Sequence, residues 1–375
     1  MSSVWIGTYP PDGLGTPAGK GEGVWHLDVG EHGALTAHQV NVLDAPSYVA
    51  AHPTLPVLYA VSEVAPTVVT ALSASDASHV LGTVTVGGDS GCHAQIIADG
   101  RALAVCNYGS GELAIVQLGA DGVPTSTTPQ QVFTHHGSGP RQDRQEGPHA
   151  HFSAVAPGAR HLLVADLGSD TLWCYSIGAG GLLEPQGAAT TFPPGSGPRH
   201  FAVHGENIYV VCELDHTLRT LRWDRTSSTA ELIHEQPVTL APQRTGNAVY
   251  DAHIEIIDAP SGPVLLASVR GVDVIAVFDI APEGEARYRC AFDTGYWPRH
   301  FSITPDAGGI QRLIVTNEKG HQVRAFALAD VFALPPETEW GAIAQLESTS
   351  AEVTSPACIC VGPRSVAQPP EPTEG

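Results

Sequence analysis

Lysine is almost missing from this chain of 375 residues, and acidic residues are in clear excess. Lysine occurs only at Lys20 and Lys319, and 18 Lys and Arg residues against 39 Asp and Glu residues give a formal net charge of −21. Such a chain has no bulk attraction to nucleic acid or to an anionic membrane surface, so we expect neither partner. Arginines that converge locally can still bind an anionic small molecule, because guanidinium grips carboxylate or phosphate in a forked geometry.

Paired cysteines and long apolar runs are also missing. The seven cysteines are scattered, with no CxxC pair, which argues against a disulfide framework or a zinc site. No apolar run approaches the ~20 residues that span a bilayer. The opening MSSVWIGTYP has neither a basic start nor an apolar core, so it predicts no signal peptide. We expect a cytoplasmic protein that needs no metal or other cofactor.

The chain does contain a short apolar strand that recurs and ends in a polar residue. The copies are VWIGT (Val4 to Thr8), LYAVSE (Leu58 to Glu63), LAVCN (Leu103 to Asn107), LLVAD (Leu162 to Asp166), YVVCE (Tyr209 to Glu213), LASVR (Leu266 to Arg270) and IVTNE (Ile314 to Glu318). From Glu63 to Asn317 the polar ends are 44, 59, 47, 57 and 47 residues apart. That period is typical of a propeller blade and not of a helical repeat.

Each copy has neighbouring strands on both sides. Short turns such as GSG, GSD and GVD lead into a following strand, which predicts hairpins. The preceding strands begin at Pro46, Cys92, Pro148, Pro198, Asp251 and Pro298. Six units are complete in this way. The seventh takes its first strand from Pro356 to Gly362 and its others from VWIGT and GVWHLDV near the N-terminus.

The sequence therefore predicts an all-β fold, a seven-bladed β-propeller whose ring is closed by N- and C-terminal strands in one blade. We expect residues 1–364 to form this single domain. The Pro/Glu-rich residues 365–375 are expected to be a disordered tail. The segment VRAFALADVFAL is the best candidate for a turn of helix.

Polar side chains gather where the first strands open, at one mouth of the channel. The openings hold Tyr48, His93, His149, His151, Arg199, His200, His253, Glu255, Arg299 and His300. The ends of the repeated strands add Asn107, Glu213 and Arg270, if they face inward. Such a pocket suits general acid–base work on an anionic substrate. The chain has no glycine-rich phosphate loop, HExxH helix or GxSxG elbow.

Several of these residues also have a purely structural interpretation. Arg199 and Arg299 could serve as scaffolding that bonds to backbone carbonyls. His200 and His300 alternate to the other face from these arginines, so packed histidines are expected there. The polar residues expected to form turns are Glu63, Asn107 and Asp166. The residues expected at the surface are His135 and His136.

Motifs along the chain resemble the lactonase family of seven-bladed propellers, which includes propeller-type 6-phosphogluconolactonases and fungal carboxy-muconate lactonizing enzymes. They are GSGPRQDRQEGPHAH, the repeated GPRH and WPRH, VCELDHTL and LASVRGVDVIAVF, and the resemblance covers roughly Val4 to Gly362. It implies a metal-free catalytic set of His151, Arg199, Glu213 and Arg270. The expected substrate-binding residues are Arg144, His149, His253, Glu255, Arg299 and His93. Where family members tend to read Glu-x-His, this chain has His253 before Glu255.

The resemblance implies a lactone hydrolase, and 6-phosphoglucono-1,5-lactone is the first expected substrate. His151, with or without Glu213, would activate water, and arginines would hold the substrate anion. A muconate-type cycloisomerase could use the same four residues. A non-catalytic binding propeller is the third possibility, since this fold has many roles. That last hypothesis predicts that the four residues fail to share a pocket.

Overall fold

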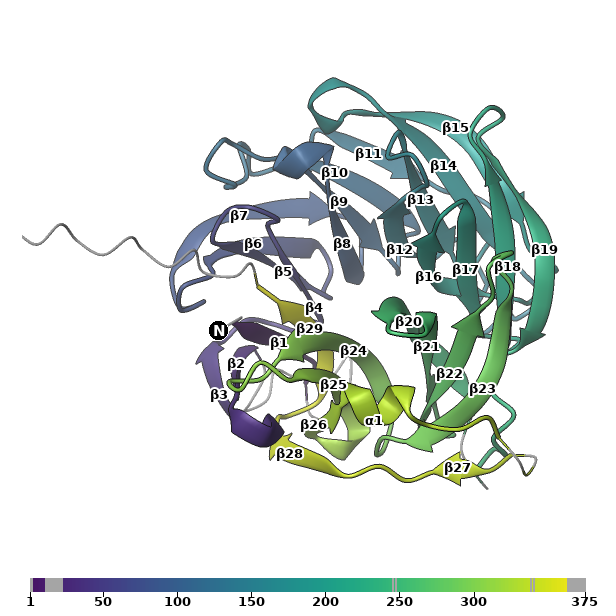
Figure 1. The fold of residues 1–375 in the computed structure, drawn as a ribbon. Coiled ribbons are helices and arrows are strands. Elements are labelled where there is room, and N and C mark those ends of the chain that lie inside the picture. The colour runs from purple at the N-terminus through teal and green to yellow at the C-terminus, as the bar shows by residue number, and fades with distance from the viewer. Residues whose placement is uncertain are drawn as a thin grey trace, which may run out of the picture.

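Seven antiparallel sheets stand around one axis in the computed structural model, which describes residues 3–10, 23–244, 246, 248–337, 339 and 341–362 (Figure 1). The predicted tail at residues 365–375 and Lys20 lie outside the described residues. Each inner strand contacts the inner strands of both neighbouring blades, and this series of contacts closes on itself. The predicted seven-bladed propeller is confirmed.

Every blade contains four main strands, arranged from the inner strand outward. The inner strands are β4 (Tyr48–Ala51), β8 (Gly91–Ile97), β12 (Ala150–Val155), β16 (Pro198–His204), β20 (Tyr250–Ala259), β24 (Pro298–Pro305) and β29 (Pro356–Val361). The second strands are β5 (Val57–Ser62), β9 (Ala102–Asn107), β13 (His161–Asp166), β17 (Asn207–Cys212), β21 (Gly262–Arg270), β25 (Gln311–Asn317) and β1 (Val4–Thr8). These second strands are the repeated strands of the sequence.

The outer half of each blade contains a third and a fourth strand that pair antiparallel. The third strands are β6 (Thr67–Ser73), β10 (Glu112–Gln117), β14 (Thr171–Ile177), β18 (Thr217–Asp224), β22 (Val274–Ile280), β26 (Gln322–Ala327) and β2 (Val24–Val29). The outermost are β7 (Val80–Gly87), β11 (Gln131–Thr134), β15 (Leu183–Thr191), β19 (Thr229–Pro237), β23 (Ala286–Asp293), β28 (Ser348–Glu352) and β3 (Leu35–Asn41). This fourth strand was not identified in the sequence, because its side chains are largely exposed, as in β19.

The remaining elements are short. A two-residue strand, β27 (Ile343–Ala344), extends one blade by pairing parallel to β23. The helical turn expected in VRAFALADVFAL is α1 (Leu328–Phe332). Four 3-10 turns are η1 (Glu31–Gly33), η2 (Ala98–Gly100), η3 (Ala179–Gly181) and η4 (Glu318–Gly320).

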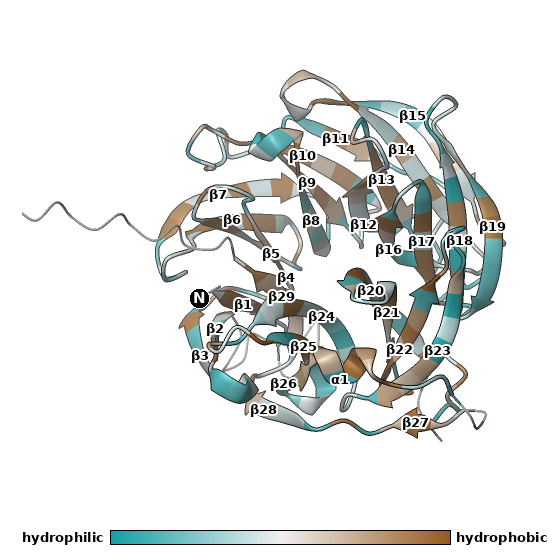
Figure 2. Cartoon of the chain, in the orientation of Figure 1, coloured by the Kyte–Doolittle hydropathy of each residue, from teal (hydrophilic) through white to brown (hydrophobic). Residues whose placement is uncertain are grey.

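The core lies between blades, where each second strand is covered on both faces. Every residue of β5, β9 and β17 is buried, which explains why these strands read as continuous apolar runs. One cluster joins Val61 and Val69 of one blade to Val105 of the next. In Figure 2 the hydrophobic colour is strong on middle strands such as β9 and β22, whereas β19 is mostly hydrophilic. Burial of apolar surface between blades therefore holds the ring together.

Both ends of the chain meet in the closing blade, as predicted. β1 pairs antiparallel with β29, with Val4 opposite Val361 and Gly7 opposite Cys358. The sheet continues through β2 to β3. Because the inner strand comes from the C-terminus and the others come from the N-terminus, their hydrogen bonds close the ring.

Candidate active site

Bulges at the openings of the inner strands point side chains at one end of the central channel. In β8, β12, β16 and β24, the pairing with the second strand skips one residue near the strand start. The skipped residues are Cys92, His151, Arg199 and Arg299. A β-bulge leaves the extra residue unpaired and re-aims its side chain. All four line the same pocket.

Polar residues at or just beyond the ends of the second strands complete that pocket. Glu213 follows β17, Arg270 ends β21, and Tyr9 lies beyond β1. The pocket has a volume of about 230 Å³ and is lined by Tyr9, Glu63, Cys92, Tyr108, Arg144, His151, Arg199, Glu213, Arg270, Arg299 and Glu318. The four residues predicted as catalytic therefore share one pocket, contrary to what the binding-propeller hypothesis predicts.

Glu213 is the electrostatic centre of the pocket. Its Oε1 lies 2.6 Å from Nη2 of Arg144. Its Oε2 lies 2.8 Å from Nε of Arg199 and 2.9 Å from Nη2 of Arg270. The side chain of Glu213 is only 4% exposed, so one buried carboxylate holds three guanidinium groups together.

These charges shift one another's protonation. Burial alone would raise the pKa of Glu213, but Arg270, Arg144 and Arg199 outweigh it and hold the pKa far below the usual range. Burial and the nearby Arg270 lower the pKa of Arg199, and Glu213 opposes that shift. Glu213 is thus a permanent anion that keeps the buried cations charged. A carboxylate in this state is a poor proton acceptor at neutral pH.

His151 is the buried imidazole of the pocket. Burial and the charge of Arg199 lower its pKa well below 6.5, although Glu213 acts in the opposite direction. Its ring is therefore neutral at pH 7. Nδ1 of His151 is buried and has no hydrogen-bond partner among the described residues. The ring edges lie against Tyr108 and His200, at centroid distances of 5.6 and 5.2 Å.

Arg144 reaches the pocket from the long loop before β12. Its guanidinium lies over the ring of Tyr250, 5.3 Å from the centroid, and bonds to Glu213. Within the same loop, Gln145 is fully buried and donates to Leu167 O and Asp170 Oδ1. The loop is thereby anchored, and it forms part of the pocket rim.

His149 lies beside the pocket and not in its lining. Its ring stacks on Tyr108 with centroids 4.4 Å apart, and Nδ1 lies 2.7 Å from the carbonyl oxygen of Tyr108. Its backbone N–H donates to Asp166. Asp166 also accepts from Gly168 and Ser169, so its predicted turn-forming role is confirmed.

The expectation that His135 lies at the surface is wrong. This residue is 5% exposed, and its ring nitrogens lie 2.8 Å from Asp166 Oδ2 and 2.9 Å from the hydroxyl of Tyr175. The carboxylate and phenol satisfy both polar atoms of the ring, which makes burial possible. The neighbouring His136 is exposed, as expected.

Aromatic and imidazole side chains from six of the inner strands contact one another in a closed ring. Successive contacts have centroid distances from 3.8 to 6.1 Å. The members are Tyr48, His93, Phe152, His200, His253 and His300. His93 and His253, predicted to bind substrate, are therefore packed in this ring and not in the pocket lining. The packed roles expected for His200 and His300 are confirmed.

Glu255 also lies outside the pocket lining. It comes two residues after His253 on β20, so both side chains point to the same face of the strand. Its Oε2 is buried and has no hydrogen-bond partner in the described part of the chain, and burial raises the pKa of the carboxyl group to about 7. Of the six residues predicted to bind substrate, only Arg144 and Arg299 line the pocket.

Most of the opposite wall was missed in the sequence, which predicted Arg299 there but neither Tyr9 nor Glu318. There the hydroxyl of Tyr9 donates to Oε2 of Glu63 at 2.5 Å and accepts from Nη2 of Arg299 at 2.5 Å. Glu318 pairs with Arg299 at 3.3 Å. The interpretation of Glu63 as only a turn former is wrong, because it lines the pocket. The available signal was its place after β5, which matches the place of Glu213 after β17.

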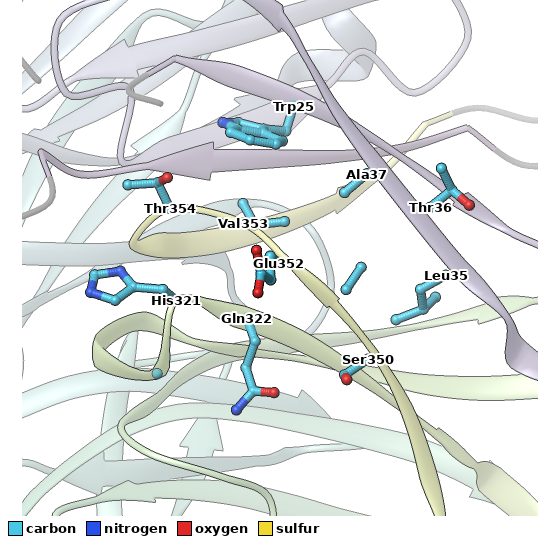
Figure 3. Close-up of a pocket in the computed structure, with 12 residues that line it drawn as sticks. Trp25, Leu35, Thr36, Ala37, His321, Gln322, Ser350, Glu352, Val353 and Thr354 are labelled. Atoms are coloured by element: carbon cyan, nitrogen blue, oxygen red, sulfur yellow. The ribbon is translucent and has the colours of Figure 1, made fainter. Parts of the chain in front are cut away.

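A larger hollow of about 940 Å³ lies between the closing blade and the blade of β26 and β28. Figure 3 shows its side chains, among them Trp25, His321, Gln322 and Glu352. No arginine lines it, so it lacks the converging cations that an anionic substrate requires. We therefore place the candidate active site in the smaller pocket.

A group of residues able to hold a metal ion lies outside the lining of both hollows. Across the described residues, the one group of three or more metal-binding side chains with converging ligand atoms is His26, Asp28 and His38. It belongs to β2 and β3 of the closing blade. No residue of the group lines the candidate active site.

The comparison with family models defines the class of protein. The family of lactonases with a seven-bladed β-propeller matches residues 3–361. The chain belongs to this family, and it is a lactonase. The expected family is thereby confirmed.

Individual relatives are similar over much of the chain. The chain is 29% identical over 280 residues to a 6-phosphogluconolactonase of Bacillus subtilis, which covers 74% of each protein. It is also 29% identical over 251 residues to a 6-phosphogluconolactonase of Formosa agariphila, which covers 64% of this chain and 67% of the relative. Among solved structures, a periplasmic gluconolactonase of Pseudomonas aeruginosa has a TM-score of 0.78 and 24% identity, with 96% of this chain and 98% of the other covered. That likeness shows the fold. Among the described residues, no helix is long and apolar enough to cross a membrane.

Proposed function

We propose that this lactonase hydrolyses 6-phosphoglucono-1,5-lactone. The observation that carries the proposal is the convergence of His151, Arg199 and Arg270 on Glu213 in one pocket. Four arginines and three glutamates line the pocket, so its formal charge is 4 − 3 = +1 although the whole chain carries −21. A cationic pocket in an anionic protein favours an anionic substrate. The name of the B. subtilis relative supports the phosphorylated lactone.

Each of the pocket residues has its own role in the proposed hydrolysis. Neutral His151 takes a proton from water, and the water oxygen attacks the lactone carbonyl carbon. Arg199 and Arg270 stabilise the negative charge that develops on the carbonyl oxygen, an effect worth roughly 2–4 kcal/mol for each donor in the transition state. Glu213 keeps both guanidinium groups charged and oriented. Arg144, at the rim, is placed to hold the anionic part of the substrate.

A panel of substrates tests the proposal. Purified protein is given 6-phosphoglucono-1,5-lactone, unphosphorylated glucono-lactone and a carboxy-muconate, with spontaneous lactone hydrolysis subtracted. We expect turnover of the phosphorylated lactone, and a fall of about 10²–10⁴-fold in His151→Ala. His136→Ala changes an exposed histidine of the adjoining loop and should be neutral. Turnover of the carboxy-muconate alone would replace the proposal by a cycloisomerase. The predicted cytoplasmic location remains part of the proposal.

A further inference from the structure

The wall opposite Glu213 holds a second carboxyl group in a very different setting. Glu63 is 7% exposed and Tyr9 is 3% exposed, and their oxygens are 2.5 Å apart. Arg299 donates to the Tyr9 hydroxyl and not to the Glu63 carboxyl, and its guanidinium lies 4.7 Å from the centre of the Tyr9 ring. The phenol therefore stands between the arginine and the carboxyl group.

This arrangement separates the acidities of the two glutamates. Burial raises the pKa of Glu63, and Arg299 only partly offsets that shift. Three guanidinium groups in direct contact lower the pKa of Glu213. Two carboxyl groups whose pKa values are moved in opposite directions within one site are the usual sign of separate acid and anion roles.

Lactone hydrolysis needs a proton donor as well as a proton acceptor. When the bond between the carbonyl carbon and the ring oxygen breaks, the ring oxygen leaves as an alkoxide and must receive a proton. The arginines of that wall remain charged while they stabilise the oxyanion, and His151 has the task of accepting a proton from water. The Glu63 carboxyl group on the facing wall, whose pKa burial raises, lines the same pocket and is placed for the complementary step.

We propose that Glu63 is the general acid of this lactonase and that Tyr9 and Arg299 are its positioning residues. The inference rests on the proposed lactone hydrolysis. Oε1 of Glu63 carries the proton and gives it to the leaving ring oxygen as the carbon–oxygen bond breaks. The hydroxyl of Tyr9, already bonded to Oε2, then stabilises the carboxylate. Solvent restores the proton to Glu63, and His151 releases to solvent the proton that it took from water.

Steady-state kinetics with 6-phosphoglucono-1,5-lactone from pH 5.5 to 8.5 test the assignment. We expect Glu63→Gln to lower kcat by about 10²–10⁴-fold, to leave KM within a few fold, and to remove the fall of kcat/KM at high pH. Glu63→Asp should restore part of the rate, and Tyr9→Phe should lower kcat less than Glu63→Gln does. Glu206→Gln, at an exposed glutamate, serves as the matched control.

The outcomes separate the two proposals. If the native enzyme turns over the lactone and Glu63→Gln keeps both its rate and its high-pH limb, the role of Glu63 is wrong and lactone hydrolysis stands. If the native enzyme does not turn over the lactone, the proposed substrate fails, and the acid assignment fails with it. A rise in KM with kcat unchanged would also overturn the role of Glu63 as a proton donor.

An independent observation concerns the outer half of the closing blade. His26 and Asp28 are two residues apart on β2, so they share one face, and His38 of β3 is directly opposite His26 in the strand register. Nδ1 of His26 lies 3.6 Å from Oδ1 of Asp28, and the two imidazole rings have centroids 5.2 Å apart. Ligand atoms of all three lie within 4.8 Å of one another.

The packing fixes this face of the hairpin. The ring of Trp5 lies against His26 at 4.6 Å, and the side chain of His26 is only 19% exposed. Two imidazoles and one carboxylate are ligands that Zn²⁺ accepts, with bonds of about 2.0–2.2 Å and open positions for water. We infer that His26, Asp28 and His38 form a surface site for a divalent transition metal, which clamps the edge strand β3 to β2.

Calorimetric titration of the full chain with Zn²⁺ tests this site, with Co²⁺ absorption as a second probe. We expect one saturable site, a rise in Tm when the metal binds, and at least a tenfold loss of affinity in His38→Ala. His204→Ala removes an exposed histidine elsewhere and should bind as the native protein does. Absence of saturable binding, or equal affinity in His38→Ala, overturns the inference.

Discussion

Nε of Arg199 and Oε2 of Glu213 lie 2.8 Å apart within a single blade, and neither side chain is more than 4% exposed. Arg199 is the bulged residue near the start of β16, and Glu213 directly follows β17, the strand with which β16 pairs. Arg199 also donates to the carbonyl oxygen of Ala252 in the next blade. It is therefore both a scaffold residue and a pocket residue, and the two interpretations of the sequence are compatible.

Removal of the Glu213 charge should damage stability as well as activity. Glu213→Gln leaves Arg199 and Arg270 buried near each other without their shared anion. Breaking a buried ion pair in this way costs about 3–5 kcal/mol. Urea denaturation should show this loss, and lactone turnover should fall in parallel.

Glu206→Gln is the control for that variant. Glu206 pairs with Arg225 on the surface, and both side chains are about half exposed. Its urea midpoint should match that of the native protein. An equal midpoint for Glu213→Gln would contradict the central role that we assign to this carboxylate.

The four histidines in the ring of aromatic and imidazole side chains should make the protein less stable in mild acid. Burial, with neighbouring positive groups, lowers the pKa values of His93, His200 and His253 well below 6.5, and that of His300 to about 3. Below about pH 6.5 these histidines bind protons in the unfolded chain but stay neutral in the folded protein. The free energy of unfolding therefore falls as the pH falls. Each such histidine contributes up to roughly 1.4 kcal/mol per pH unit.

His93→Phe tests the contribution of one ring member. Between pH 7.5 and 5.5, the variant should lose about 1 kcal/mol less of its free energy of unfolding than the native protein loses. Urea unfolding at several pH values measures the difference. His204→Ala should follow the native profile, because its side chain is exposed. Parallel profiles for the native protein and His93→Phe would show that His93 is not the source of the effect.

Glu255 should act in the opposite direction. Its pKa is raised to about 7, so ionisation of this carboxyl group costs the folded state stability as the pH rises from about 4.5 to 7. Glu255→Gln removes that titration. The variant should be more stable than the native protein at pH 7.5, by about 3 kcal/mol, and the gain should vanish near pH 4.5. A gain that does not depend on pH would point to packing instead.

His135 should hold the rim loop in place. His135→Ala leaves Asp166 and Tyr175 without their buried partner, which costs roughly 1–3 kcal/mol. Because the same loop carries Arg144, KM for the lactone should rise. Hydrogen exchange should speed up in residues 136–147. The adjacent His136→Ala should change neither quantity, and identical behaviour of both variants would show that the contact does not anchor the loop.

The blades were predictable because second strands buried on both faces repeat as apolar runs with turn residues between them. The wall of the pocket around Glu213 was predictable because His151, Arg199, Glu213 and Arg270 stand in recognisable motifs. The error at His93 has a local cause. The bulge in β8 sends Cys92 to the pocket and His93 to the ring, and the sequence gives no sign of a bulge there.

Contacts between distant segments were harder to foresee. Tyr9 meets Arg299 across 290 residues of chain, so only the closed ring brings them together. His135 reads as a loop residue, and its burial depends on Asp166 and Tyr175, which come from later strands. Glu63 was assigned to a turn because nothing near it in the chain shows that the pocket has a second wall.

The closing blade also determines where the first and last described residues lie relative to the pocket. The N–H of Gly362 donates to the carbonyl oxygen of Ser3 at 2.8 Å, so the first and last described residues emerge side by side. β1 runs from there to Thr8, and Tyr9 lies in the pocket. Ser3 and Gly362 therefore lie on the face opposite the pocket mouth. A support or partner joined to the chain at either of these two residues would leave the candidate active site facing outward, toward the solution from which substrate arrives.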